Sequence, residues 1–442
     1  MSSGTRSTNP RADSQSKEQR DVHAAIDAVW RIESPRLIAG LARITRDVGA
    51  AEDLAQDALV AALEQWPASG IPSNPGAWLM AAAKHRAIDL VRRRSLLERK
   101  HGELGRQLEE QQENSMPDYV SALDDDIGDD LLRLIFTSCH PVLSTDAQLA
   151  LTLRLMGGLT TTEIARAFLV PEPAVSQRIV RAKRTLADAH VPFEIPRGAE
   201  LSARLANVLQ VIYLIFNEGY SATAGDDWHR PALCEDALRL GRILAELSPQ
   251  EPEVQGLVAL MEIQASRTRA RVNAKGEPIL MLEQNRALWD QLLIHRGFAA
   301  LARAEELSRV MGSIGTYTLQ AAIAACHARA LTADATDWPR IAALYAALAR
   351  VAPSPIVELN RAVAVGMAEG PAAGLAILDV IADHAALKNY HLLPSVRADL
   401  LRKLGRRTEA RAEFERAAAL TQNSRERDLL LARAAACASD TN

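Results

Sequence analysis

The chain has 442 residues, of which 48% are hydrophobic and 24% are charged, a composition typical of a soluble globular protein with roughly two to four domains. Its net charge of -4 excludes a protein that is basic over its whole surface, although the sum can hide a basic stripe on one element. Aromatic residues make up only 4%, and the abundance of Ala, Leu and Arg favours helices over strands. We therefore expect an all-α fold.

The cysteines and apolar runs predict a cytoplasmic protein with no membrane partner. The cysteines are far apart and form no CxxC pair, as expected of reduced core residues; they are Cys139, Cys234, Cys326 and Cys437. The apolar runs are too short to span a bilayer. Residues 1–20 are polar and lack the apolar segment of a signal peptide, so we expect a disordered tail there.

The first predicted domain covers residues 21–95 and contains an amphipathic helix over residues 51–66. Its apolar stripe consists of Ala55, Ala58, Leu59, Ala62, Leu63 and Trp66. Its opposite face carries Asp53, Gln56, Asp57 and Glu64. Paired carboxylates can serve acid–base catalysis, but no His or glycine-rich loop lies nearby in the sequence. Two interpretations remain, a solvated face and a docking surface for a basic partner.

A second helix of this domain is predicted over residues 78–94, after a break rich in proline and glycine at residues 67–75. Its basic side consists of Trp78, Lys84, His85, Arg86, Arg92, Arg93 and Arg94. Cations beside an aromatic residue can hold a nucleic-acid backbone and stack unpaired bases, and Asp89 would orient Arg92 or Arg93. The alternative is a helix C-terminus whose charges complement the helix dipole.

A helix-turn-helix is predicted in a second domain, residues 131–190, after an acidic linker over residues 96–130. Thr160 and Glu163 form a capping box, and a second helix follows over residues 172–188. The apolar face of that helix carries Val175, Ile179, Ala182 and Leu186. Its polar face carries Ser176, Gln177, Arg178, Arg181, Lys183 and Arg184. Such a face suits base edges and phosphates in the major groove; the alternative is a hairpin with a solvated basic face.

The third region, residues 196–442, is predicted to be a helical solenoid. Three residues occupy similar positions at steps of 35, close to the period of about 34 in tetratricopeptide repeats; they are Pro353, Lys388 and Asn423. The period fades between about residues 265 and 315. Stacked helix pairs present a concave surface for a peptide or protein partner.

Two groups of polar residues contain side chains of the kinds found in metal or catalytic sites. The first lies between Asn217 and His229, and the second is Cys139 with His140. Neither has the spacing of metal ligands. We therefore expect no metal, no cofactor and no catalytic residue.

Three motifs, in this order, resemble those of bacterial sigma factors, which direct RNA polymerase to promoters. Residues 51–57 look like their polymerase-docking helix. Residues 75–79 followed by residues 86–93 resemble their helix for melting and reading the −10 element, and residues 160–187 resemble their −35 reader. No third domain separates the two modules, as in the extracytoplasmic-function group.

This resemblance implies a role for each surface. The clamp of core RNA polymerase would be contacted by Glu52, Asp53, Gln56 and Asp57. A loop at residues 68–77 would hold a flipped −10 base. Promoter DNA at −10 would be gripped by Trp78, Lys84, His85, Arg86, Arg92 and Arg93, although Lys84–His85 stands where Arg-Asn is more usual. The −35 element would meet Ser176, Gln177, Arg178, Arg181, Lys183 and Arg184.

The C-terminal region also resembles a known extension. Residues 212–222 and 359–365 look like the tetratricopeptide-like extension of one subgroup of these factors, which implies regulation through the extension without a membrane anti-sigma partner.

One alternative function for the whole chain is that of a helix-turn-helix regulator, which binds duplex operators and needs no acidic face at Asp53 and Asp57. The other is an enzyme with a pocket near residues 217–229.

Overall fold

The computed structural model describes residues 10–102, 127–168, 170–221, 230–274 and 277–439. These residues form helices throughout, and the described part of the chain contains no strand beyond one isolated bridge between Val272 and Pro278. The predicted all-α fold is confirmed. Much of the predicted acidic linker, residues 103–126, and the first part of the predicted tail, residues 1–9, lie outside the described residues.

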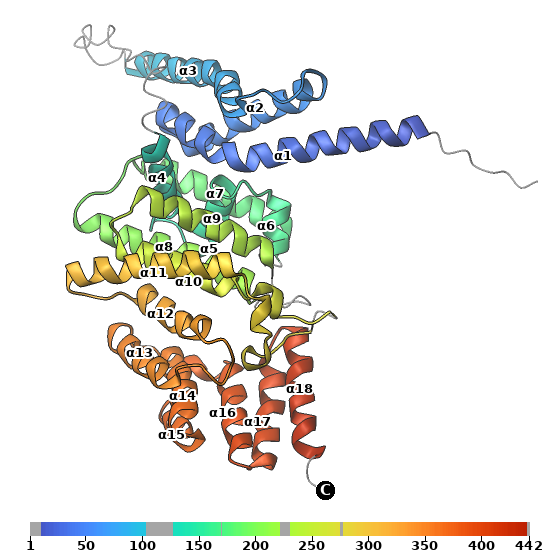
Figure 1. Cartoon of the computed structure of the whole chain (residues 1–442). Helices are drawn as coiled ribbons and strands as arrows, with labels where there is room; N and C mark the ends of the chain where they lie inside the picture. The colour runs from blue at the N-terminus through green and yellow to red at the C-terminus, as the bar shows by residue number, and fades with distance from the viewer. Residues whose placement is uncertain (1–9, 103–126, 169, 222–229, 275–276, 440–442) are drawn as a thin grey trace, which may run out of the picture. The chain divides into compact units, whose positions relative to one another are not determined.

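The described chain divides into two compact units, whose helices are labelled in Figure 1. The first unit holds residues 10–166 and 170–211, and the second holds residues 167–168 and 212–439. The division falls inside the helix α8 (Ala199–Tyr220). Each unit has its own buried apolar residues.

Three helices begin the first unit: α1 (Pro10–Thr45), α2 (Val48–Ser69) and α3 (Pro75–Gly102). The helix α1 starts inside the predicted disordered tail, and α3 continues into the predicted linker. Both extensions contain Lys, Arg and Glu, which lose little conformational freedom in a helix. Pro35 and Pro67 lie within α1 and α2.

The ends of α2 are determined by local interactions. Asp47 caps its start, because the Asp47 carboxylate accepts a hydrogen bond from the Ala50 N–H at 3.1 Å. Gly70 ends it with a φ of 81°, which glycine adopts without strain. Near this end, the buried Trp66 ring meets Trp78 of α3 edge to face, with 5.3 Å between ring centroids. The aromatic pair therefore connects α2 to the start of α3.

The remaining helices of the first unit are α4 (Ile127–Ser138), α5 (Thr145–Leu155), α6 (Thr161–Phe168), α7 (Glu172–Asp188) and part of α8. The predicted capping box is present: the Glu163 N–H donates to the Thr160 hydroxyl at 3.1 Å, and the Thr160 N–H donates to the Glu163 carboxylate at 2.8 Å. Pro173 lies in the first turn of α7. The apolar residues predicted to face inward from α7 are buried, so the helix-turn-helix is confirmed.

The second unit contains the rest of α8 and ten further helices within its described residues. They are α9 (Pro231–Leu247), α10 (Pro252–Ala265), α11 (Gln291–Met311), α12 (Thr316–Arg329), α13 (Trp338–Val351), α14 (Pro355–Ala368), α15 (Pro371–Ile381), α16 (Leu392–Lys403), α17 (Arg407–Leu420) and α18 (Ser424–Ser439). Pro353, Lys388 and Asn423 precede α14, α16 and α18, respectively. The predicted 35-residue step therefore spans one helix pair.

An irregular segment separates α10 from α11. It contains short 3-10 turns at Thr268–Ala270, Met281–Glu283 and Arg286–Leu288. The helical period was predicted to fade over about residues 265–315, and this segment accounts for the first half of that range. The second half is different, because α11 is a regular helix of 21 residues capped by Asp290.

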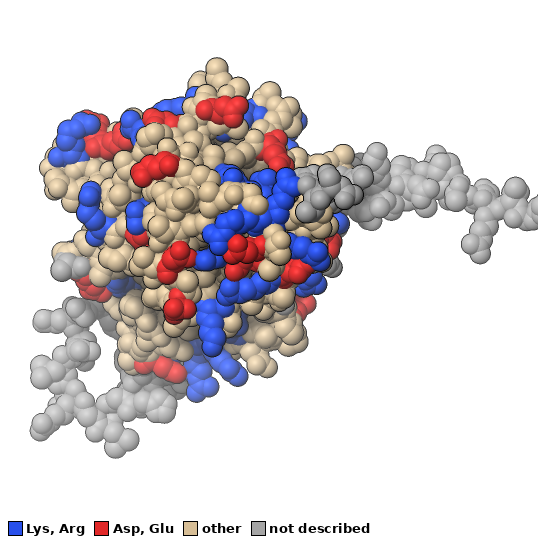
Figure 2. Space-filling view, turned by 90° about the horizontal axis from the view of Figure 1, so that it is seen from below, with Lys and Arg blue, Asp and Glu red and all other residues tan. Residues whose placement is uncertain are grey.

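One face of the molecule carries surface charges of both signs. On the face drawn in Figure 2, Lys and Arg side chains lie interspersed with Asp and Glu. This mixture agrees with the small net charge of -4. Among the described helices, none is both long enough and apolar enough to cross a membrane.

Candidate nucleic-acid interface

Two of the four residues predicted to bind polymerase are exposed on α2. The side chains of Asp53 and Asp57 are 77% and 57% exposed. Gln56 is half-buried and donates a hydrogen bond to the Glu52 carboxylate at 2.7 Å. Asp53 lies 3.7 Å from Lys183 Nζ and Asp57 lies 2.9 Å from Arg86, but both carboxylates are solvated, so a basic partner surface can still reach them.

Glu52 was predicted on this face, but the structure buries it. Its side chain is 3% exposed, and it lies between Arg154 Nε at 2.6 Å and Lys183 Nζ at 2.5 Å. Burial by itself raises the pKa of Glu52, but the charges of Lys183 and Arg154 outweigh this and hold the pKa below its ordinary value. Glu52 is therefore an ionised internal link between α2, α5 and α7, because both of its cations come from the other helices.

The basic side of α3 is largely solvated. His85, Arg86, Arg92 and Arg93 are exposed, whereas Trp78 and Lys84 are half-buried. Arg86 pairs with Asp57 of α2 at 2.9 Å, so one residue of each predicted surface touches the other. The predicted pairing of Asp89 with Arg92 or Arg93 is absent from the ion pairs of the described residues. An exposed pair such as Asp57–Arg86 contributes about 0–1 kcal/mol, so a partner can displace it at little cost.

The polar face of α7 divides into an exposed part and an inward part. Ser176, Gln177, Arg181 and Arg184 are exposed. Arg178 is 32% exposed and pairs with Asp146 at 3.2 Å. Lys183 was predicted to contact DNA, but its side chain is only 18% exposed and pairs with Glu52. The exposed part combines neutral hydrogen-bonding groups near the helix start with cations further along, which suits bases and phosphates, respectively.

Further ion pairs connect α1 to the helix-turn-helix region within the first unit. Arg31 pairs with Glu163 at 2.5 Å, and Arg43 pairs with the buried Asp130 at 3.2 Å. The Glu163 carboxylate also accepts hydrogen bonds in the capping box of α6. Together with Glu52, these contacts hold α1 and α2 against α4 to α7.

The polar cluster near the start of the second unit is only partly described, because residues 222–229 lie outside the described residues. Glu218 pairs with Arg230, and the Tyr220 hydroxyl accepts a hydrogen bond from Arg267. Within the described parts of the chain, no three His, Cys, Asp or Glu side chains are grouped to hold a metal ion.

The Cys139–His140 pair belongs to the packing around α4 and α5. Cys139 is buried, with its sulfur 3.4 Å from the Thr152 hydroxyl. Burial raises the pKa of this thiol to about 12, and a protonated thiol is a poor nucleophile and metal ligand. His140 Nδ1 accepts a hydrogen bond from the Val142 N–H.

The role of Arg154 as a partner of Glu52 was not predicted from the sequence. It lies in α5, whose other residues are mostly apolar and buried, and its guanidinium also donates to the Leu159 carbonyl at 3.0 Å. A lone cation in an apolar helix requires a buried partner. That requirement was a usable signal, but it does not identify Glu52 as the partner.

Two segments of the first unit match families of transcription factors. Residues 30–96 match Sigma-70 region 2, and residues 133–186 match Sigma-70, region 4. Residues 204–305 match a family of unknown function (DUF6596). The chain is 43% identical over 415 residues to an uncharacterized protein of Rhizobium meliloti (strain 1021), and the match covers 91% of this chain and 93% of that protein. No solved structure matches the chain.

Region 2 followed by a helix-turn-helix region 4 defines a class, the sigma factors, which bring core RNA polymerase to promoters. Within this class, the chain belongs to the extracytoplasmic-function-type sigma factors that carry a C-terminal extension. It therefore directs promoter-specific initiation of transcription, with core RNA polymerase and promoter DNA as its partners.

Proposed function

We propose that three exposed surfaces of the first unit divide the work of initiation between them. The acidic face of α2 binds core polymerase through Asp53, Gln56 and Asp57. The basic side of α3 binds the −10 element through Trp78, Lys84, His85, Arg86, Arg92 and Arg93. The exposed face of α7 binds the −35 element through Ser176, Gln177, Arg178, Arg181 and Arg184. The factor acts by binding and not by catalysis, and it works in the cytoplasm.

The observation that carries this proposal is the separation of charge among solvated side chains. Asp53 and Asp57 are more than half exposed on α2, whereas Arg181 and Arg184 are exposed on α7. An acidic face repels DNA phosphates and attracts a basic protein surface, and a basic face does the reverse. One unit therefore offers different surfaces to a protein and to DNA.

Glu52 and Lys183 have a different place in this proposal. Glu52 is buried and Lys183 is half-buried against it, so neither is readily available to a partner while α2 and α7 stay together. Their direct contacts with polymerase or DNA would require the two helices to separate. We therefore assign them to holding α2 against α7, with Arg154 as the second cation.

We also propose that the second unit regulates initiation and offers its surface to a protein or peptide partner. Support comes from its successive helix pairs α14–α15 and α16–α17, since stacked pairs of helices form extended binding surfaces.

Transcription from fragmented genomic DNA by purified core polymerase tests the proposal. The full chain should give discrete start sites that share −10 and −35 elements, and a truncation after Val211 should change their yield if the second unit regulates. Asp57→Arg should reduce polymerase binding, and Gln177→Ala, at the start of α7, should reduce promoter choice with polymerase binding intact. The absence of discrete starts, or the same defect in both variants, would contradict the division of work.

A further inference from the structure

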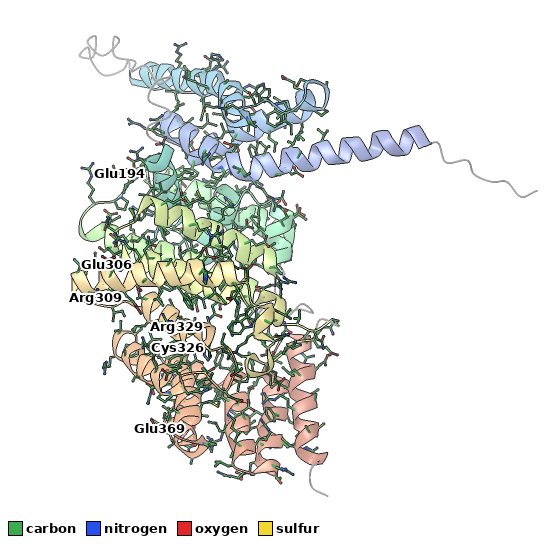
Figure 3. The ribbon with its side chains drawn as sticks, in the orientation of Figure 1. Glu194, Glu306, Arg309, Cys326, Arg329 and Glu369 are labelled. Carbon is green, nitrogen blue, oxygen red and sulfur yellow. The ribbon has the colours of Figure 1, made fainter. Side chains whose placement is uncertain are left out.

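The second unit contains a cavity of about 210 Å³ that the proposed function does not use. It lies between α8, α10, α12 and α13, and its polar lining includes Gln264, Arg267, Gln320 and His327. Aromatic walls are formed by Tyr213, Phe216, Tyr220 and Tyr345. In Figure 3, Cys326 and Arg329 are labelled and mark the turn of α12 that carries His327.

Arg267 is a buried cation held by neutral groups. The residue is 8% exposed. Its guanidinium donates hydrogen bonds to the Tyr220 hydroxyl and, at 2.6 Å, to the Gln264 side-chain oxygen. It also lies 5.6 Å from the ring centroids of both Tyr220 and Trp289. A buried guanidinium is costly unless a charge or strong hydrogen bonds compensate it.

The charge around the cavity is one-sided. Its described lining contains no Asp or Glu. Arg286 adds a second cation close by, and its guanidinium donates to the carbonyls of His327 and Ala330, both at 2.6 Å. The described lining therefore offers a cation and neutral hydrogen-bond donors, which is an environment that favours an anion.

His327 is a buried polar residue in the wall of the cavity. It is 8% exposed, it lines the cavity, and its Nδ1 has no hydrogen-bond partner among the described residues. A buried polar atom without a partner is unusual in a folded protein. Burial and the charges of Arg267 and Arg286 lower the pKa of His327 to about 3, so the ring is neutral and one nitrogen can donate to a bound oxygen.

We propose that this cavity binds a small organic monocarboxylate, with Arg267 pairing with the carboxylate and the aromatic walls packing against its apolar body. The volume limits the ligand, because sites for drug-sized molecules usually measure about 300–1,000 Å³. A compact acid with one ring or a short chain is therefore the class that fits. The alternative occupant, a peptide segment, is too large to be enclosed here.

Calorimetry of the full chain tests this site with benzoate and butyrate, using benzamide as the uncharged analogue of benzoate. We expect benzoate to bind with a Kd below about 1 mM and benzamide to bind at least tenfold more weakly. Arg267→Gln should raise the Kd for benzoate at least tenfold. Arg329→Gln is the matched control, because Arg329 is an exposed arginine at the end of α12 that stacks on Phe298 and does not line the cavity; it should change the Kd less than twofold.

A second variant separates loss of binding from loss of folding. Ala324 lines the cavity on α12, so Ala324→Leu fills space without removing a charge and should abolish benzoate binding while the chain stays helical. Binding of neither carboxylate at about 10 mM would overturn the proposal. So would equal affinity for benzamide, or an unchanged Kd in a folded Arg267→Gln protein. The test measures binding alone, so its outcome is independent of transcription activity.

Discussion

At the scale of the residue, Glu52 should be essential to the stability of the first unit. We expect Glu52→Gln to lower the free energy of unfolding by about 3 kcal/mol, because Arg154 and Lys183 keep their charges when the buried partner is lost. Urea denaturation of the full chain measures the change. Asp53→Asn is the matched control, since Asp53 is 77% exposed and its loss should matter by less than about 0.5 kcal/mol. Equal effects of the two changes would show that Glu52 is not buried in solution.

A second residue, His327, should make the stability of the second unit depend on pH. Its pKa is lowered from 6.5 to about 3 by burial and by the charges of Arg267 and Arg286. Between these values the unfolded chain binds more protons than the folded chain, so stability falls as the pH falls. From pH 6.5 to about pH 5 the loss should be about 2 kcal/mol, at about 1.4 kcal/mol per pH unit.

The variant His327→Asn isolates this effect, because Asn is polar and does not titrate. Its denaturation midpoint in the second unit should fall less than that of the unmodified chain over the same pH range. Identical pH dependence in the two proteins would mean that His327 is accessible to protons in the folded state.

At the scale of the element, two cations on α7 should behave differently although they are two positions apart. Arg181 is exposed, whereas Lys183 faces Glu52. Arg181→Ala should remove about one phosphate contact and so reduce the slope of log K against log salt concentration for promoter binding by about one. Lys183→Gln removes the same charge, but should leave the salt slope unchanged and destabilise the first unit. Binding of the holoenzyme to promoter DNA over a salt series measures both, and a reduced slope for Lys183→Gln would place Lys183 on the DNA.

The start of α8 is an integral part of the first unit. Arg204 is 6% exposed and donates to the Phe136 carbonyl at 2.8 Å, and the Asn207 amide donates to the Cys139 carbonyl. A truncation after His190 removes both donors. The carbonyls of Phe136 in α4 and of Cys139 just after α4 then lose these partners. We expect it to be less stable than a truncation after Val211 by about 2 kcal/mol or more. Thermal unfolding compares them, and equal midpoints would show that α8 is dispensable.

These elements show what a single sequence can reveal about this protein. The inward face of α7 was predictable because Val175, Ile179, Ala182 and Leu186 recur at the helical period, and the capping box of α6 follows from two residues three apart. The inward turn of Lys183 was not predictable, because a helical period separates apolar from polar faces but does not say which polar side a neighbouring helix covers. The same limit hid the Glu52–Arg154 pair, whose members are 102 positions apart.

At the scale of the whole molecule, the unit boundary inside α8 was also beyond the sequence pattern. A continuous helix has no break in period at Val211, so the expected boundary fell earlier, at residues 190–196, where Pro192 and Pro196 interrupt the chain. Long-range packing defines the boundary instead. The first part of α8 contacts α4 through Arg204 and Asn207, and the second part lines the cavity of the second unit.

The two compact units should unfold in two distinguishable steps, because cooperativity requires extensive shared packing and distant substitutions act independently. Calorimetry of the full chain should show two transitions at neutral pH. Glu52→Gln should lower only one of them, since its partners all lie in the first unit, and Ala324→Leu should shift only the other. For a unit of this size, the expected loss of about 3 kcal/mol in Glu52→Gln corresponds to a decrease of several degrees in Tm. If either substitution moved both transitions together, the chain would unfold as one cooperative body, and a signal received by the second unit would then reach α2 and α7 through folding stability itself.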